Sequence, residues 1–170
     1  ADADWGDDPR HVDYGKIYAA RFPVLRRAFV RGYPRDRALV ERFARENPWV
    51  KNYALFMALK AHFGMKSWLE WEDREIARHQ SGAVARYEKL LEEDIHFHIY
   101  LQYLFFQQWG KLKAYINGLG IQIIGDLPIY VAMDSADVWA EPEFFQLDSD
   151  NRPVEVAGVP PDYFTADGQL

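Results

Sequence analysis

The sequence contains no cysteine and no long uncharged hydrophobic run. Without cysteine, a disulfide scaffold, a thiolate zinc site and a cysteine nucleophile are all excluded. A membrane-spanning helix needs about 18 or more consecutive apolar residues, and no stretch of this chain approaches that length. No basic segment followed by an apolar one opens the chain, so no secretory signal is visible. We therefore expect a cytoplasmic protein that does not bind a membrane.

Positive charge is scarce in the last third of the chain. Residues 118–170 contain one basic residue, Arg152, and 10 acidic ones, whereas residues 1–117 contain 19 basic and 16 acidic residues. An acidic surface repels phosphate backbones, so we expect no nucleic-acid partner. A basic run nearer the N-terminus comprises Arg21, Arg26, Arg27, Arg31, Arg35 and Arg37. Asp36 within this run and the absence of Gly-rich spacing favour a solvated helix face over an anion-binding site.

Proline is absent from residues 49–127 of a 170-residue chain that is 49% hydrophobic and 16% aromatic. This length and composition suit one globular domain with a hydrophobic core. Successive helices can form in the proline-free run, because an interior proline would remove a hydrogen bond and clash with the preceding turn. The pattern predicts helices over 37–46, ending before Asn47-Pro48, and over 49–63, ending before Gly64. It also predicts a helix capped by Ser67 and a long one over 83–117 that stops at Gly118.

The character of the sequence changes at residue 118. The apolar run Ile121-Gln122-Ile123-Ile124 lies between glycines and predicts a strand covered on both faces, the type found in parallel sheets. Asp126 follows directly, at the carboxyl end of this strand, where barrel and open-sheet enzymes place their chemistry. The alternative is an aspartate that only caps a turn. A hairpin is predicted further on, with its turn at 148–151.

Several other patterns in the sequence resemble binding sites only in part. His96 and His98 are two residues apart, which is about 200° of helical rotation, so they predict core histidines and not a metal pair. The run from Asp148 begins like a calcium loop but places Arg152 and Pro153 where a ligand and a glycine belong. The glycines at 118 and 120 precede the strand, whereas a phosphate-binding glycine loop follows one. We expect neither a metal nor a cofactor.

Two segments near the C-terminus have patterns of their own. Residues 134–139 predict a short helix capped by Asp134, with Asp137 in its first turn. Residues 158–164 form a loop stiffened by paired prolines, and this loop presents Tyr163 and Phe164. Such a loop either packs its rings against the protein or covers a bound ligand.

Two long motifs resemble the 4-α-glucanotransferases, also called amylomaltases. The first is IIGDLPIYVAMDSADVW at 123–139, and the second is VAGVPPDYF at 156–164, followed by Gly168-Gln169. They occur in the order found in that family. The stretch from Val12 to Gly118 is similar in layout to the helical insertion that precedes these motifs in the family.

The resemblance implies a fold and a reaction. It implies a member of the α-amylase clan, with a (β/α)8 barrel and helical insertions, that moves an α-1,4-glucan segment onto the 4-hydroxyl of another glucan or of glucose. Asp126 would match the acid of the clan's first conserved region. Asp162, Tyr163 and Phe164 would match a loop that arches over the sugar-binding cleft. These four residues are the substrate-binding residues that the resemblance predicts, and the partners are maltooligosaccharides and other α-1,4-glucans.

The same resemblance predicts what this chain lacks. A barrel of this kind needs about 250 residues, so we expect an α/β fold in which the barrel is incomplete. Residues 1–117 would form the helical insertion, and residues 118–170 one parallel strand, a short helix and the substrate-loop region. In the family the catalytic carboxylates lie on later strands, so we expect none of them here. The chain would then be an inactive piece whose exposed apolar faces are covered by the rest of the barrel. The alternative is a non-catalytic helical module that binds carbohydrate or protein.

Overall fold

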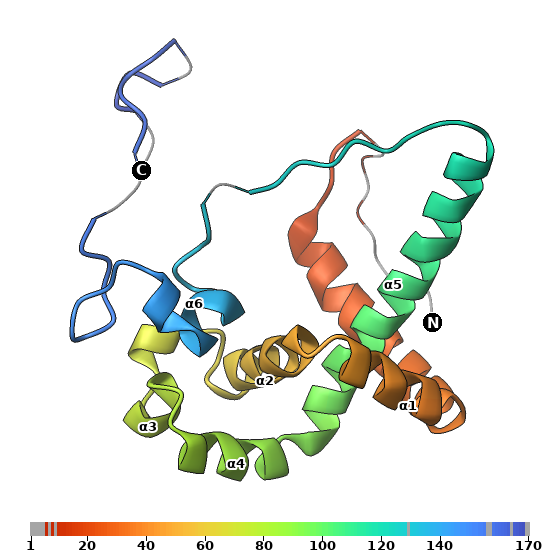
Figure 1. Cartoon of the computed structure of the whole chain (residues 1–170), viewed down its shortest axis with the longest axis horizontal. Helices are drawn as coiled ribbons and strands as arrows, with labels where there is room; N and C mark the ends of the chain where they lie inside the picture. Colours follow the sequence, from red (N-terminus) through yellow and green to blue (C-terminus); the bar gives the residue numbers. More distant parts are fainter. Residues whose placement is uncertain are drawn as a thin grey trace. The chain divides into compact units, whose positions relative to one another are not determined.

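The computed structural model describes residues 6, 8, 10–128, 130–155, 158–163 and 165–168, and most of them are helical. The helices are α1 (Tyr14–Glu46), α2 (Trp49–His62), α3 (Arg74–Ala77), α4 (Ser81–Leu90), α5 (Glu92–Gly118) and α6 (Ala136–Ala140), with the 3-10 turns η1 (Trp68–Glu70) and η2 (Pro142–Phe144) (Figure 1). The chain forms two compact units. Unit 1 comprises Ala1–Ala54 and Glu93–Gln122, and unit 2 comprises Leu55–Glu92 and Ile123–Leu170.

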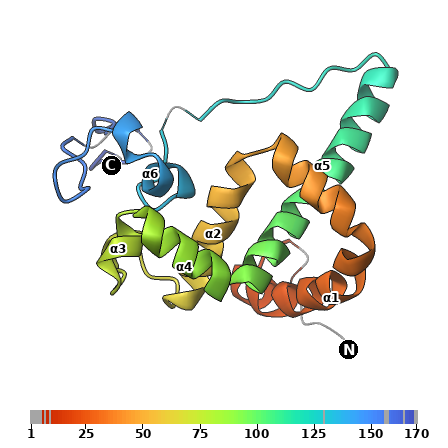
Figure 2. The same ribbon diagram turned by 60° about the horizontal axis from the view of Figure 1, so that its bottom comes forward.

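Helix α1 is much longer than the predicted helix at 37–46. It begins after Asp13, whose side chain accepts a hydrogen bond from the amide of Lys16 at 2.9 Å. Pro23 and Pro34 lie inside it, and the helix changes direction along its length (Figure 2). An interior proline removes one hydrogen bond and pushes against the preceding turn, which bends a helix without necessarily ending it. The predicted end before Pro48 is confirmed, since α1 stops at Glu46.

The core of unit 1 joins α1, the start of α2 and α5. Its buried residues are Phe29, Val40, Ala44, Val50, Ala54, Phe97, Ile99, Tyr100 and Tyr103. The rings of Phe29 and Phe97 meet edge to face, with centroids 5.6 Å apart. Most arginines of the basic run are exposed, as predicted. Arg26 is the exception, because its guanidinium pairs with Asp94 and lies 3.8 Å from the centroid of the Phe97 ring.

Both histidines of α5 are part of this unit's packing, as the sequence predicts. His98 is only 7% exposed. His96 is half-buried and stacks on Tyr33 with ring centroids 5.3 Å apart. Burial, together with the positive charge of Arg26, lowers the pKa of His98 to about 4, and the carboxylate of Asp94 opposes this shift only in part.

The predicted single helix over 83–117 is wrong, because it is two helices. Leu91 leaves the helical conformation with φ −111° and ψ 22°, and its amide donates back to the carbonyl of Tyr87 at 2.9 Å. The side chain of Leu91 is 8% exposed. Tertiary packing that buries this leucine overrides a local pattern that suits a continuous helix. Helix α5 then begins at Glu92 and ends at Gly118, the predicted stop.

Unit 2 is built on an aromatic core. Three tryptophans, Trp68, Trp71 and Trp139, are each no more than 1% exposed. Trp71 stacks on Phe63 with centroids 5.2 Å apart and meets Trp139 edge to face at 5.8 Å. Trp139 Nε1 donates to the carbonyl of Ile76 at 2.9 Å. This buried hydrogen bond satisfies the indole and joins α6 to α3.

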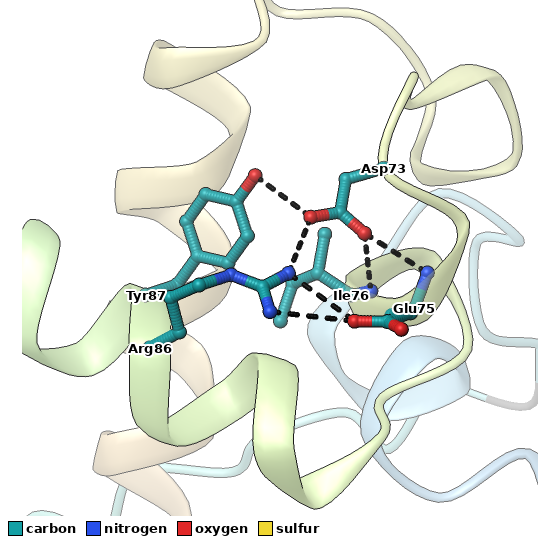
Figure 3. Close-up of polar contacts among 5 residues, drawn as sticks. All are labelled: Asp73, Glu75, Ile76, Arg86 and Tyr87. Atoms are coloured by element: carbon teal, nitrogen blue, oxygen red, sulfur yellow. Dashed lines mark hydrogen bonds and ion pairs between the residues drawn. The ribbon is translucent and has the colours of Figure 1, made fainter.

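Asp73 begins α3 and links it to α4 (Figure 3). Its carboxylate accepts from the amides of Glu75 at 3.0 Å and Ile76 at 3.3 Å, which is the geometry of a helix N-cap. It also accepts from Arg86 Nη2 at 2.7 Å and Tyr87 Oη at 3.2 Å. Burial alone would raise the pKa of Asp73, but these hydrogen bonds outweigh it and the pKa is lowered.

The predicted cap at Ser67 is wrong. Ser67 precedes the 3-10 turn η1, and its side chain makes no capping hydrogen bond. The amide of Trp68 donates to Asp134 Oδ1 at 3.4 Å instead. The amide of Glu70, one of those that a cap at Ser67 would satisfy, donates to the backbone carbonyl of Ser67 at 2.9 Å.

The predicted strand is also absent from the described residues. Residues 121–128 have no regular secondary structure, and Ile124 and Leu127 are 93% and 84% exposed. A strand needs a neighbour that pairs with its amides and carbonyls, and no described segment supplies one here. The predicted hairpin is reduced to one antiparallel bridge between Leu147 and Pro153, with Asn151 in the left-handed conformation (φ 60°) at its turn.

Candidate functional site

The first motif of the sequence is held in unit 2 through Asp134. Lys60 of α2 is 7% exposed, and its Nζ donates to Asp134 Oδ2 at 2.6 Å. The same ammonium donates to the carbonyl oxygens of Met65 at 3.0 Å and Lys66 at 2.7 Å. All three of its donors are therefore satisfied.

The prediction that Asp134 caps the short helix is wrong. Helix α6 starts at Ala136, and Ser135 caps it by accepting a hydrogen bond from the amide of Val138 at 3.3 Å. Asp137 lies in the first turn, as predicted. The carbonyl of Met133 accepts from Trp68 Nε1 at 2.8 Å. Three consecutive residues before α6 thus make hydrogen bonds within unit 2: Met133 to Trp68, Asp134 to Lys60 and Trp68, and Ser135 to α6 itself.

Asp126 lies upstream of this fixed point, in the extended stretch 121–128. Its side chain is exposed. The sequence predicts that Asp126 ends a strand. In the described structure, residues 121–128 form no strand and pair with no other strand. In this position the carboxylate is accessible to a ligand or to a further part of the protein.

Asp162 and Tyr163 share one turn of the second motif. Asp162 Oδ1 accepts from the amide of Thr165 at 3.0 Å, and the amide of Asp162 donates to the carbonyl of Thr165 at 3.1 Å. These bonds shape the turn, as short polar side chains commonly do. The side chain of Tyr163 is 89% exposed. Phe164, the fourth predicted substrate-binding residue, lies outside the described residues. The structure thus brings Asp162 and Tyr163 into one turn, and Asp126 belongs to a different segment.

A cavity in unit 2, lined by both charged and apolar residues, was not predicted from the sequence. Its volume is about 850 Å³, and its walls are η1, α3 and the turn at 150–153. The lining residues are Ser67, Trp68, Leu69, Glu70, Arg74, Glu75, Ala77, Arg78, Gln80, Asp150, Asn151, Arg152 and Pro153. Residues 70–78 mix acidic residues with arginines, and such a mixture is as typical of a solvated surface as of a binding site. The cavity exists because residues 150–153 fold back near α3, and that arrangement has no local sequence signal.

Within the described residues, no three His, Asp or Glu side chains come together in a way that could hold a metal ion. No helix of the described part of the chain is long and apolar enough to cross a membrane.

Comparison with known proteins gives one consistent family. A sequence model described as 4-alpha-glucanotransferase matches residues 2–170. The 4-alpha-glucanotransferase of Thermus thermophilus is 48% identical over 164 residues, which are 93% of this chain and 32% of that protein. The enzyme of the same name from Streptococcus pneumoniae serotype 4 is 43% identical over 169 residues, covering 98% of this chain and 34% of its own length.

A solved structure agrees with these relatives. The chain matches an amylomaltase from Streptococcus agalactiae, determined in complex with acarbose, with a TM-score of 0.90 and 47% identity. The match covers 98% of this chain and 34% of that one. The chain therefore spans about a third of the length of the relatives it matches. It belongs to the 4-alpha-glucanotransferase family.

Proposed function

We propose that this chain is part of an enzyme that transfers α-1,4-glucan segments to the 4-hydroxyl of an acceptor glucan or glucose. The observation that supports this most is the likeness to an amylomaltase structure over nearly the whole chain, including both sequence motifs. The reaction would be a retaining double displacement through a covalent glycosyl intermediate. Such chemistry uses two carboxyl groups about 5–5.5 Å apart.

The chain would contribute substrate contacts and not the chemical step. Residues 1–117 would form the helical insertion, and residues 118–170 a barrel strand, a short helix and the substrate loop. Asp126, Asp162, Tyr163 and Phe164 would contact the glucan, and the catalytic carboxylates would lie outside residues 1–170. The exposure of Asp126 and Tyr163 supports this role, since both side chains are accessible to a sugar.

Exposed apolar side chains support a larger parent protein. The second half of α5 and the segment after it expose large apolar groups: Phe105, Trp109, Leu112, Tyr115, Leu119, Ile121, Ile124 and Leu127. Large apolar side chains exposed in such number are typical of surfaces that another part of a protein covers. We propose that the remainder of the barrel covers these residues. Residues 121–127 would then gain the strand partners that they lack in the described structure.

The test compares the 170-residue chain with the full-length protein that contains it. Each is incubated with maltotriose, and the products are separated by length. The full-length protein should produce glucose together with longer maltooligosaccharides, whereas the chain alone should leave maltotriose unchanged. Transfer by the chain that survives re-purification would overturn the assignment of the catalytic groups to residues outside it. A full-length protein that binds maltooligosaccharides without transferring them would favour a binding module instead.

A further inference from the structure

We propose that the cavity between η1, α3 and residues 150–153 binds a short segment of α-1,4-glucan, an inference that rests on the proposed function. The cavity's volume, about 850 Å³, falls within the about 300–1,000 Å³ typical of small-molecule sites. None of the four substrate-binding residues predicted from the sequence lines it. It would therefore add a sugar-binding site that neither sequence motif encodes.

The charges that line the cavity balance. Three guanidinium groups, those of Arg74, Arg78 and Arg152, are matched by the carboxylates of Glu70, Glu75 and Asp150. A site for an anion would carry an excess of positive charge, and a site for a cation an excess of negative charge. A balanced lining favours a neutral ligand whose groups both donate and accept hydrogen bonds. Sugar hydroxyls do both.

The lining also offers the two kinds of surface that a pyranose ring needs. Gln80 and Asn151 provide amides, each of which donates and accepts. Leu69 and Pro153 provide apolar surface for the C–H faces of the ring. Ala77, which also lines the cavity, is 5% exposed and belongs to the core of unit 2. The wall of the cavity is therefore continuous with the packed interior of this unit.

Several lining groups are held in place before any ligand arrives. Arg74 Nη1 donates to the carbonyl of Leu69 at 2.8 Å, which links α3 to η1. Trp68 is 1% exposed, and its indole is bonded to Met133. A preformed wall lowers the cost of ordering side chains on binding.

Arg78 is the lining cation best placed for a ligand. Its Nη2 lies 3.9 Å from Asp150 Oδ1, which is too long for a hydrogen bond. Both side chains are more than half exposed. The guanidinium of Arg78 can therefore donate to a sugar hydroxyl, and the carboxylate of Asp150 can accept from one. Neither side chain has to break a hydrogen bond to the other to do so.

The test follows amide hydrogen exchange of the intact protein, with and without maltotetraose. Exchange should slow in peptides that cover 67–80 and 148–153. Arg78→Ala and Asn151→Ala should each weaken this protection, with the apparent Kd raised about tenfold by the loss of a charge-assisted hydrogen bond in the first case. Arg37→Ala is the matched control, because Arg37 is an exposed arginine of α1 paired with Glu41 at 2.8 Å.

Each other outcome overturns the proposal. Exchange at 67–80 and 148–153 that is unchanged by saturating maltotetraose means that no glucan binds there. Protection by inorganic phosphate but not by maltotetraose means an anion site, and equal protection by cellotetraose means that α-linked glucan is not the ligand. Protection that survives both cavity variants means that binding occurs elsewhere. Transfer activity on maltotriose is measured separately, so a protein that transfers glucan without protection of this cavity contradicts the inference alone.

Discussion

The ammonium group of Lys60 and the carboxylate of Asp134 form a hydrogen-bonded ion pair of 2.6 Å between residues 74 positions apart. Lys60 lies on α2, and Asp134 lies just before α6. The lysine also donates to two carbonyls of the turn that follows α2. This relationship ties the first family motif to the helical part of unit 2.

Lys60→Met should destabilise unit 2. The methionine keeps the length of the side chain but removes the ammonium that donates to the carbonyls of Met65 and Lys66 and to the carboxylate of Asp134. A hydrogen bond to a charged group contributes about 1.5–3 kcal/mol, and we expect a loss of about 2 kcal/mol because Asp134 is 40% exposed and partly solvated. Lys51→Met, at an exposed position of the same helix, is the control. Equal midpoints for the two variants in urea unfolding would contradict the prediction.

Gly32→Ala should destabilise unit 1 although alanine favours helices. A Cβ at position 32 would lie 2.1 Å from Tyr100 Oη and 3.1 Å from its Cζ, and Tyr100 is only 4% exposed. Overpacking of this kind costs about 1–3 kcal/mol. Gly110→Ala in α5 meets no atom within 4 Å and should instead stabilise by up to about 1 kcal/mol.

A second substitution tests the mechanism of the Gly32 effect. Tyr100→Phe removes the hydroxyl that the new Cβ would strike, so the double variant should recover part of the stability lost in Gly32→Ala. Thermal melting of the wild type, the two single variants and the double variant gives the coupling energy between positions 32 and 100. Additive effects would mean that the clash is relieved elsewhere.

His98 should make unit 1 less stable as the pH falls. Its pKa is about 4 in the folded protein, against 6.5 for an ordinary histidine. A group whose folded pKa is lowered binds fewer protons when folded, so its contribution is complete above pH 6.5 and is lost progressively towards pH 4. The full effect is about 3 kcal/mol. His98→Gln should flatten the stability profile between pH 6.5 and 4, as measured by urea unfolding. Parallel profiles for the two proteins would show that another group is responsible.

Asp73→Ala should loosen the junction of α3 and α4. The variant loses the N-cap of α3 and the acceptor for Arg86 and Tyr87, and loss of a cap alone costs about 1 kcal/mol. Asp73→Asn keeps an oxygen that can cap the helix but removes the charge that faces Arg86. The stability of this variant should therefore lie between that of the wild type and that of Asp73→Ala. Amide exchange of Glu75 and Ile76 reports the cap directly. An unchanged rate for Ile76 in Asp73→Ala would contradict its role.

The sequence predicts the features that depend on neighbouring residues. Pro48 and Gly64 mark the ends of α1 and α2 because each acts through its own backbone. The burial of His98 follows from a helix segment that is apolar almost all round. These features need no knowledge of what packs against the chain.

Features that depend on distant partners could not be predicted. The pairing of Asp134 with Lys60 joins residues 74 positions apart, and the break at Leu91 occurs at a side chain that is buried in the folded unit. The segment 121–127 has strand-like residues, but hydrogen bonds from neighbouring strands are what make a strand. The cavity beside Arg78 likewise depends on a turn more than 70 residues away.

The last prediction concerns the loop at 158–164 in the full-length enzyme. Tyr163 is 89% exposed and offers a flat apolar face and a hydroxyl to a glucose ring. Paired prolines at 160 and 161 restrict the loop and lower the cost of ordering it on a sugar. A glucanotransferase must favour sugar over water at its covalent intermediate, and a loop that covers the acceptor excludes water. Tyr163→Ala and Phe164→Ala should therefore reduce transfer more than hydrolysis.

The measurement is the ratio of hydrolysis to transfer on maltotriose for each variant, with the melting temperature as a check on folding. Loss of one aromatic contact of about 0.5–1.5 kcal/mol should raise this ratio about two- to tenfold. Tyr163→Phe keeps the ring and removes only the hydroxyl, so it separates stacking from hydrogen bonding and should change the ratio less. If both alanine variants fold normally and keep the wild-type ratio, the two rings pack within the protein and do not guide the acceptor.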